Sequence, residues 1–186
     1  MDRIRVGVFG AGVLGGYHLD KCAAHPAVEL RGFYEVNESR RLEIEGMRGI
    51  QGYAQPHELI SRIDAAIVAT PAVSHEAVAL PCIEAGKHVL VEKPLAHSHA
   101  GGKRLVEAAR RQNCVLHVGH SEFFNPVFQN LLATNPRPQF MEIHRLAAFS
   151  PRGTDVAVIV DLMIHDLHLV MRLCNEIPVL DTIAAT

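Results

Sequence analysis

Short apolar runs alternate with amphipathic stretches along the first two-thirds of the chain. The apolar runs, rich in β-branched residues, predict strands over residues 3–10, 28–35, 63–70, 88–92 and 115–119. The stretches between them predict helices over residues 12–24, 38–48, 74–85 and 97–112. Strands that alternate with helices of about a dozen residues are typical of a doubly wound α/β fold with a parallel sheet.

The pattern changes after residue 119. It predicts a short helix over 127–133, a strand over 139–149, a helical apolar run over 155–173 and the start of another strand near Val179. We therefore expect a first domain over 1–119 and the beginning of a second domain over 120–186 that stops before it is complete.

The stretch GAGVLG at residues 10–15 fits the pattern GxGxxG between a predicted strand and a predicted helix. In that setting the first glycine permits a tight turn, the second lets a pyrophosphate approach the backbone, and the third lets the helix pack on the strand. The start of the helix then offers N–H groups and a partial positive charge to the phosphates. The cofactor-binding residues predicted for this turn are Gly10, Gly12, Val13, Leu14 and Gly15.

Glu35 ends the second predicted strand, 20 residues after Gly15. A carboxylate in this place accepts hydrogen bonds from the adenosine ribose and repels a 2′-phosphate, which favours NAD over NADP. A glycine turn without ligand beside a solvated Glu35 is the alternative. In the loop after the third strand, Thr70, Pro71 and His75 are expected to border the cofactor.

Glu92, Lys93 and Pro94 follow the strand predicted over 88–92. The carboxyl end of a parallel strand faces the crevice in which such sheets bind ligands, so Lys93 is a candidate catalytic residue. Glu92 and Lys93 are also expected to contact the cofactor, and the proline is expected to fix a rigid turn. A surface lysine in an ordinary turn is the alternative.

Asp161 and His165 stand four residues apart, so they share one face of a helix. A carboxylate one turn before an imidazole orients the ring and raises its basicity, as a general base requires. The alternative is a helix cap at Asp161 and an ordinary histidine at His165. Asp166 and His168 fall off this face and are expected to be solvated, whereas His120 at a strand end remains a plausible site residue. The remaining histidines, His18 among them, form no recognisable constellation.

Composition excludes several classes of function. A net charge of −2 provides no basic field for nucleic acid, and no apolar run reaches the roughly 18–20 residues that span a bilayer. The first ten residues run straight into a strand, so we expect no signal peptide. The four cysteines are widely spaced, which favours buried thiols in a reducing cytoplasm over disulfides, and no metal-ligand cluster is evident.

The chain resembles the glucose-fructose oxidoreductase and inositol dehydrogenase family (Gfo/Idh/MocA) over essentially its whole length. The resemblance rests on the order of GAGVLG, Glu35, EKPLA, GHSEFFNP and DLMIHDLHL. The resemblance implies a Rossmann domain followed by an α/β domain with an open, mostly antiparallel sheet. It also implies NAD(P)-linked oxidation or reduction of a sugar or polyol. Lys93 matches the lysine of EKP, and Asp161 and His165 match the Asp and His of DxxxH. The stretch at residues 149–166 is similar to a subgroup that includes UDP-N-acetylglucosamine 3-dehydrogenases.

Two departures from the family stand out. Phe123 takes the place of the arginine usual in GHxxRFNP, so that charged contact is absent or supplied elsewhere. Members of the family are also about twice as long as this chain, and the missing part holds most of the open sheet, which closes one wall of the pocket and commonly makes the subunit interface. A homo-oligomer is therefore expected for a full-length protein.

These observations predict an NAD-dependent oxidoreductase that transfers a hydride between nicotinamide and a secondary hydroxyl or ketone of a sugar, nucleotide sugar or polyol. In this hypothesis His165 takes the hydroxyl proton, Asp161 holds the imidazole, and Lys93 donates a hydrogen bond to the same oxygen. The competing interpretations are a dinucleotide-binding regulatory or scaffold protein without turnover, and an inert fragment of a dehydrogenase.

Overall fold

The structure is a computed structural model that describes residues 3–144 and 159–174. Contacts divide the chain into two units, Met1–Gly119 and His120–Thr186, and each is described by itself. The strand predicted near Val179, part of the strand predicted over 139–149 and the start of the run over 155–173 lie outside the described residues.

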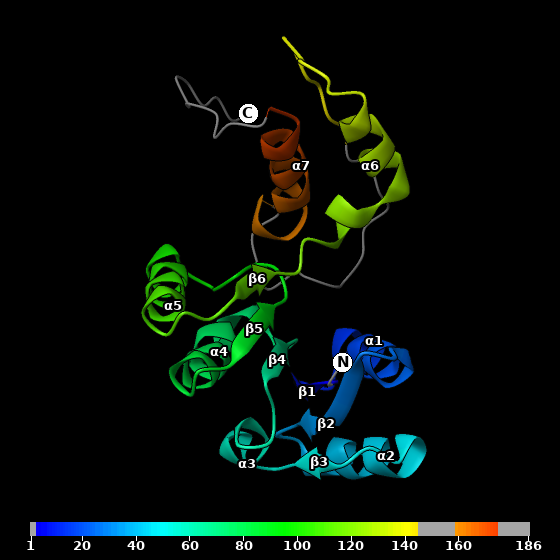
Figure 1. Ribbon diagram of the computed structural model, residues 1–186, viewed down its shortest axis with the longest axis vertical. Coiled ribbons are helices and arrows are strands. Elements are labelled where there is room, and N and C mark those ends of the chain that lie inside the picture. Colours follow the sequence, from blue (N-terminus) through cyan, green and yellow to red (C-terminus); the bar gives the residue numbers. More distant parts are fainter. Residues whose placement is uncertain (1–2, 145–158, 175–186) are drawn as a thin grey trace. The chain divides into compact units, whose positions relative to one another are not determined.

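The first unit is a six-stranded, wholly parallel sheet with the strand order β3-β2-β1-β4-β5-β6. The predicted doubly wound fold is confirmed. Its strands are β1 (Ile4–Phe9), β2 (Val28–Tyr34), β3 (Gly52–Tyr53), β4 (Ala65–Val68), β5 (His88–Val91) and β6 (Leu116–Val118). Its α-helices are α1 (Val13–Ala24), α2 (Glu38–Arg48), α3 (Pro56–Ile60), α4 (His75–Glu84) and α5 (His99–Arg111) (Figure 1).

The core of this unit lies in two layers because successive strand residues point to opposite faces of the sheet. Phe9 and Val68 are fully buried among side chains from α3, α4 and α5. Val8, the neighbour of Phe9, is buried in the other layer with Leu19 of α1 and Ile44 of α2. Burying an apolar side chain of this size contributes about 1.5–3 kcal/mol to the free energy of folding. The two buried layers therefore hold the sheet rigid beneath the loops at its ends.

Local chemistry sets the ends of the helices. The side chain of Asn37 caps α2 by accepting a hydrogen bond from the backbone N–H of Arg40, and Gly49 ends that helix in the left-handed conformation. Ser98 caps α5 in the same way through Gly101. The first turn of α1 differs, because no side chain caps it at Gly12 and it contains no acidic residue.

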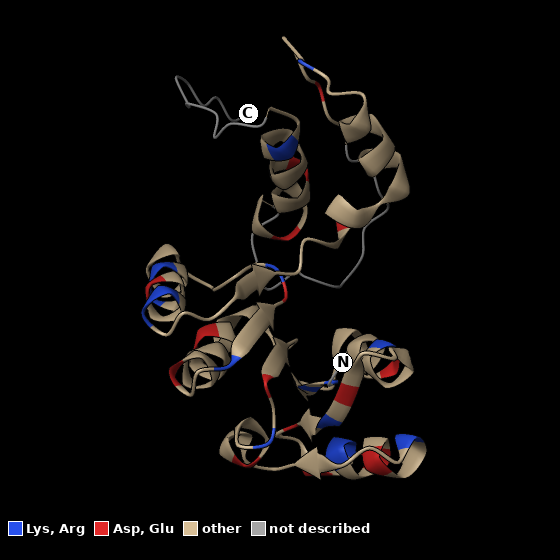
Figure 2. Ribbon diagram, in the orientation of Figure 1, with Lys and Arg blue, Asp and Glu red and all other residues tan. Residues whose placement is uncertain are grey.

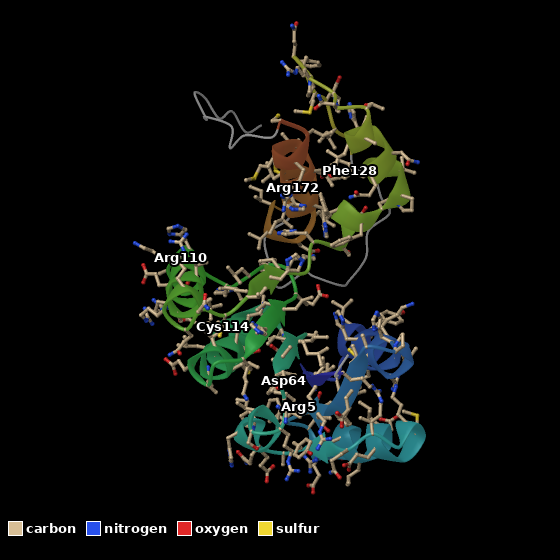
Figure 3. The ribbon with its side chains drawn as sticks, in the orientation of Figure 1. Arg5, Asp64, Arg110, Cys114, Phe128 and Arg172 are labelled. Atoms are coloured by element: carbon tan, nitrogen blue, oxygen red, sulfur yellow. The ribbon has the colours of Figure 1, made fainter. Side chains whose placement is uncertain are left out.

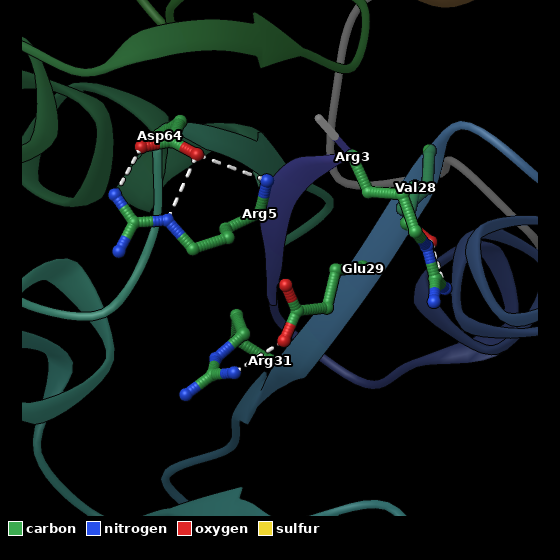
Figure 4. A network of polar contacts seen from close by, with 6 residues as sticks. All are labelled: Arg3, Arg5, Val28, Glu29, Arg31 and Asp64. Atoms are coloured by element: carbon green, nitrogen blue, oxygen red, sulfur yellow. Dashed lines mark hydrogen bonds and ion pairs between the residues drawn. The ribbon is translucent and has the colours of Figure 1, made fainter. Parts of the chain in front are cut away.

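The amino-terminal ends of the strands are joined by polar contacts (Figure 4). The guanidinium of Arg5 on β1 holds the carboxylate of Asp64, with 2.9 Å between Nε and Oδ2, and the backbone N–H of Arg5 donates to the same oxygen at 3.0 Å. These hydrogen bonds lower the pKa of Asp64 from its ordinary 3.8 to about 2. Glu29 and Arg31 form a further ion pair on β2.

The described part of the second unit is helical. A 3-10 turn η2 (Ser121–Phe124) leads into α6 (Pro126–Ala133), and a π turn η3 (Ile159–Met163) leads into α7 (Ile164–Cys174). Figure 2 shows no charged residue along α6, in contrast to α2 and α5. Residues 139–144 form no strand, so that part of the strand prediction is wrong. Among the described residues, no helix combines the length and apolar character needed to cross a bilayer.

Candidate functional site

The glycine turn joins β1 to α1 at the carboxyl edge of the sheet. Gly10 has a φ of 89°, and a Cβ there would meet Thr70 and the backbone of Ala69. A Cβ at Gly15 would lie 1.9 Å from the carbonyl oxygen of Gly10. A Cβ at Gly12 would meet nothing within 4 Å. The first and third glycines therefore close the turn, while the second leaves open space in front of it.

The open space faces the uncapped start of α1. The N–H groups of the first helical turn have no intrahelical partner, and in α1 no side chain takes that place. The helix dipole adds a partial positive charge at the same point, which suits an anionic group. Val13 and Leu14 are exposed there, with 57% and 44% of their surfaces accessible. An uncapped helix start with open space in front of it is compatible with a pyrophosphate, and binding of that group at this turn stays a prediction.

The carboxylate of Glu35 lies beside the glycine turn. Oε2 accepts a hydrogen bond from the backbone N–H of Ala11 at 3.1 Å, and Oε1 accepts one from Asn37 at 3.0 Å. The guanidinium of Arg40 reaches the same turn, because its Nε donates to the carbonyl oxygen of Ala11 at 2.9 Å. The carboxylate of Glu35 and the guanidinium of Arg40 therefore flank Ala11. The carboxylate would repel a ribose 2′-phosphate, and the guanidinium would attract it.

The loop after β4 contains Thr70, Pro71 and His75. The ring of His75 is 1% exposed, with Nε2 2.8 Å from the carbonyl oxygen of Thr70 and Nδ1 2.7 Å from that of Pro94. Both ring nitrogens thus contact the backbone. Thr70 Oγ1 is buried and has no hydrogen-bond partner within the described residues, whereas Pro71 is exposed.

Glu92 and Lys93 follow β5, and the peptide bond between Lys93 and Pro94 is cis. Glu92 Oε1 lies 2.7 Å from Nε2 of His18 on α1. Burial alone would raise the pKa of Glu92, but the hydrogen bond and charge of His18, with the backbone N–H of Lys93, lower it overall. The glycine turn, Glu35, Thr70 and Lys93 therefore follow four adjacent strands at one edge of the sheet.

His18 is a residue that the sequence reasoning missed. It was placed among the histidines without a constellation, yet it pairs with a residue 74 positions away. The only local signal is its place in the helix that begins at the GxGxxG turn, which brings it near the carboxyl edge of the sheet.

In the second unit Asp161 lies in the π turn η3, and His165 lies in the first turn of α7. Both side chains are half-buried. The structure thus places the two residues in consecutive helical turns, as the spacing suggested. Their roles as base and orienting carboxylate remain predictions.

A cluster of aromatic and basic side chains gathers around His168. Its ring stacks on that of His120 with 4.2 Å between centroids, and it is half-buried, so the expectation that His168 is solvated is wrong. Packing of α7 against η2 brings the two rings together. Arg172, labelled in Figure 3, places its guanidinium carbon 5.0 Å from the ring centroid of Phe123 and its Nε 3.4 Å from His168 Nε2.

The cysteines agree only in part with the prediction of buried thiols. Cys22 and Cys82 are buried, while Cys114 and Cys174 are partly exposed, and all four are free thiols. Burial raises the pKa of Cys82 to about 12. Over residues 3–144 and 159–174, no three side chains of the metal-binding types come together.

Comparison with known proteins agrees with this geometry. Residues 4–120 match the family described as "Oxidoreductase family, NAD-binding Rossmann fold" (GFO_IDH_MocA), and the chain belongs to this family. It is 36% identical over 180 residues to UDP-N-acetylglucosamine 3-dehydrogenase of Acidithiobacillus ferrooxidans, covering 96% of this chain and 57% of that protein. It is 27% identical to myo-inositol 2-dehydrogenase of Thermotoga maritima, covering 93% and 55%.

Solved structures give the same picture. The A. ferrooxidans UDP-N-acetylglucosamine 3-dehydrogenase superposes with a TM-score of 0.88 at 35% identity, over 94% of this chain and 58% of that one. GenD2 from gentamicin A biosynthesis, solved in complex with NAD, superposes with a TM-score of 0.79 at 26% identity, over 95% and 55%. The chain thus spans little more than half the length of these relatives.

Proposed function

We propose that this chain binds NAD and belongs to an oxidoreductase that transfers a hydride between the cofactor and a secondary hydroxyl or ketone of a sugar or nucleotide sugar. The observation that carries the proposal is the uncapped start of α1 with open space at Gly12, set beside Glu35 and Lys93 at one edge of the sheet. Its family and its dehydrogenase relatives support it.

The residues at the carboxyl edge fit a dinucleotide. The N–H groups at the start of α1 would hold the pyrophosphate, and Glu35 would hold the adenosine ribose. Thr70 and Pro71, in the loop after β4, would border the rest of the cofactor. Bound nicotinamide supplies the hydride acceptor or donor. Glu35 favours NAD, and the NAD bound to GenD2 supports that preference. Arg40, next to the same turn, is the residue that would favour NADP instead.

Proton chemistry falls to residues of this chain. Lys93 would donate a hydrogen bond to the substrate oxygen and stabilise its developing negative charge. His165 would take the hydroxyl proton during oxidation, and Asp161 would keep its ring in the useful tautomer. These roles rest on the match of Lys93, Asp161 and His165 to the EKP and DxxxH motifs of the family.

For the substrate we propose a nucleotide sugar. The relative with 36% identity is named for a UDP-sugar, whereas the inositol dehydrogenase is 27% identical. Arg172 also lies over Phe123, the residue that stands in place of the family's usual arginine, so a guanidinium is available for an anionic part of the substrate.

The first test is a fluorescence titration of the chain with NADH and, separately, with NADPH. We expect saturable binding with NADH preferred, because the Glu35 carboxylate repels a 2′-phosphate. The Glu35→Ser variant should lose most of that preference, while Glu38→Ser, an exposed change three residues along, should keep it. A preference for NADPH in the wild type would assign the dominant role to Arg40, and no binding by a folded chain would reject the proposal.

A cofactor-binding protein without turnover is the second candidate. The observation in its favour is that the glycine turn and Glu35, which would hold the cofactor, both lie within the first unit. Turnover of UDP-N-acetylglucosamine, or of another member of a panel of nucleotide sugars and polyols, would exclude this candidate. Tight NADH binding with no turnover on the whole panel would support it.

A further inference from the structure

The short turn that carries Lys93 is held on both sides by histidines from two different helices. His18 of α1 contacts the side chain of Glu92, the residue before Lys93. His75 of α4 contacts the backbone carbonyl of Pro94, the residue after Lys93. The two contacts are equally short, at 2.7 Å each.

The contact with His18 leaves Glu92 little freedom. The side chains of His18 and Glu92 are only 25% and 16% exposed. On its other side the carboxylate lies against Gly119, where an added Cβ would be 2.9 Å from Oε2. Glu92 is therefore confined between an imidazole and a backbone, and its carboxylate also interacts with the backbone N–H of Lys93.

The contact with His75 fixes the other side of the turn. The imidazole is buried, and its second nitrogen is 2.8 Å from the carbonyl oxygen of Thr70. One ring thus joins the turn after β5 to the loop after β4. Because the ring is buried, it holds the carbonyl group of Pro94 at a fixed distance from that of Thr70.

We propose that His18 and His75 are positioning residues that fix Lys93 by holding its two neighbours in the chain. The inference rests on the proposed function, since it assumes that Lys93 acts on the substrate. His18 also lies on the helix whose first turn would hold the pyrophosphate of the proposed cofactor. One rigid element therefore connects the phosphate end of the site to the turn that carries the lysine.

The test observes Lys93 directly. The chain has only four lysines, Lys21, Lys87, Lys93 and Lys103. Reductive methylation with ¹³C-formaldehyde keeps their positive charge and gives each a dimethylamine signal, and loss of a signal in Lys93→Arg assigns it. We expect His18→Gln to move the Lys93 signal and to leave the signals of Lys87 and Lys103 unchanged. Lys21 lies one turn after His18 on α1 and is left out of this comparison. His57→Gln, at an exposed position on α3, is the matched control and should move none.

A double-mutant cycle separates positioning from general loss of structure. If His18 acts through Glu92, the shifts of the Lys93 signal in His18→Gln and Glu92→Gln should be far from additive in the double variant. His75→Gln should move the same signal. If that variant does not fold, the His18 and Glu92 variants still test whether the contact between His18 and Glu92 positions Lys93. A Lys93 signal that superposes on that of the wild type in folded His18→Gln and Glu92→Gln would overturn the proposal.

Kinetics add a second readout where turnover is found. Displacement of Lys93 should lower kcat by roughly ten- to a hundred-fold, while the Kd for NADH stays near that of the wild type. If the wild type binds NADH but turns nothing over, the proposed oxidoreductase activity fails and the NMR cycle still tests the positioning. If turnover is present and unchanged in His18→Gln, the positioning role fails and the activity stands.

Discussion

Asp64 stands just before β4, at the amino-terminal end of the sheet and away from the candidate site. Its carboxylate is paired with Arg5, and the hydrogen bonds from Arg5 bring its pKa to about 2 from an ordinary 3.8. A lowered pKa in the folded state means that the pair stabilises the fold above about pH 4. That contribution is lost progressively as the pH falls from about 4 through 2.

The Asp64→Asn variant should therefore unfold at a lower urea concentration than the wild type at pH 7, and the difference should shrink as the pH falls from about 4 and vanish only below pH 2. We expect a small effect that salt reduces further, because the side chains of Arg5 and Asp64 are 47% and 39% exposed. Glu29→Gln removes one carboxylate from the neighbouring pair with Arg31 and controls for net charge. A difference that keeps its full size between pH 7 and pH 2 would show that the ion pair is not its source.

Among single residues, the contacts that the sequence could not predict are those between distant positions. Glu92 and Lys93 were expected at the end of a strand because of their place in a local pattern. The contact between Glu92 and His18 was not expected, since His18 lies 74 residues earlier and no local sequence pattern includes both residues. For the same reason His168 was expected in solvent, although α7 packs it on His120.

At the scale of elements, the turn between β1 and α1 shows two different uses of glycine. Gly15 is required for packing, because a Cβ there would overlap the carbonyl oxygen of Gly10. Gly12 has an ordinary φ of −63° and open space around it, so the fold itself tolerates a methyl group. That space lies where the pyrophosphate of the proposed cofactor would approach.

Two alanine variants separate these uses. Gly15→Ala should lower the urea midpoint of unfolding, and cofactor binding should be lost together with stability. Gly12→Ala should keep the midpoint close to that of the wild type and should still weaken NADH binding by roughly ten-fold or more, as a lost pair of hydrogen bonds would. Gly46→Ala, in α2 with nothing near its Cβ, is the control. Normal NADH affinity in Gly12→Ala would place the phosphates elsewhere.

The elements best predicted from the sequence are those with clear local signals at both ends. Helix α2 was predicted with its observed limits, and the structure shows that the side chain of Asn37 caps its start and that Gly49 ends it. Strand β3 and helix α3 were missed because a strand of two residues and a helix of five are too short to show a period. Their place is set by packing, since β3 pairs with β2, and Leu59 of α3 is buried against the sheet.

On the scale of the whole molecule, the first unit contains both the parallel sheet and the loops that would hold the proposed cofactor. It has all six strands, a packed layer on each face and the four loops at the carboxyl edge. The chain nevertheless spans little more than half of its relatives. Binding of the cofactor is therefore expected to stabilise this unit, whatever substrate the protein acts on.

Cys82 provides a probe of that stabilisation. It is fully buried in the first unit and its pKa is raised to about 12, so it reacts with a thiol reagent only when the unit opens, whereas Cys114 is partly exposed. At a concentration of NADH about 100 times its Kd, alkylation of Cys82 should slow by about a hundred-fold if opening releases the cofactor. Mass spectrometry of the separate peptides measures both rates.

The Gly12→Ala variant supplies the control for this experiment, because NADH should protect its Cys82 far less at the same concentration. Rapid alkylation of Cys82 in the native wild type would contradict the packing of β4, α4 and β5 around it. Tight binding of NADH without protection would show that Cys82 becomes accessible by a local opening that leaves the glycine turn intact. Equal protection of Cys82 and of the partly exposed Cys114 would instead indicate that the reagent reaches both thiols only through unfolding of the entire first unit.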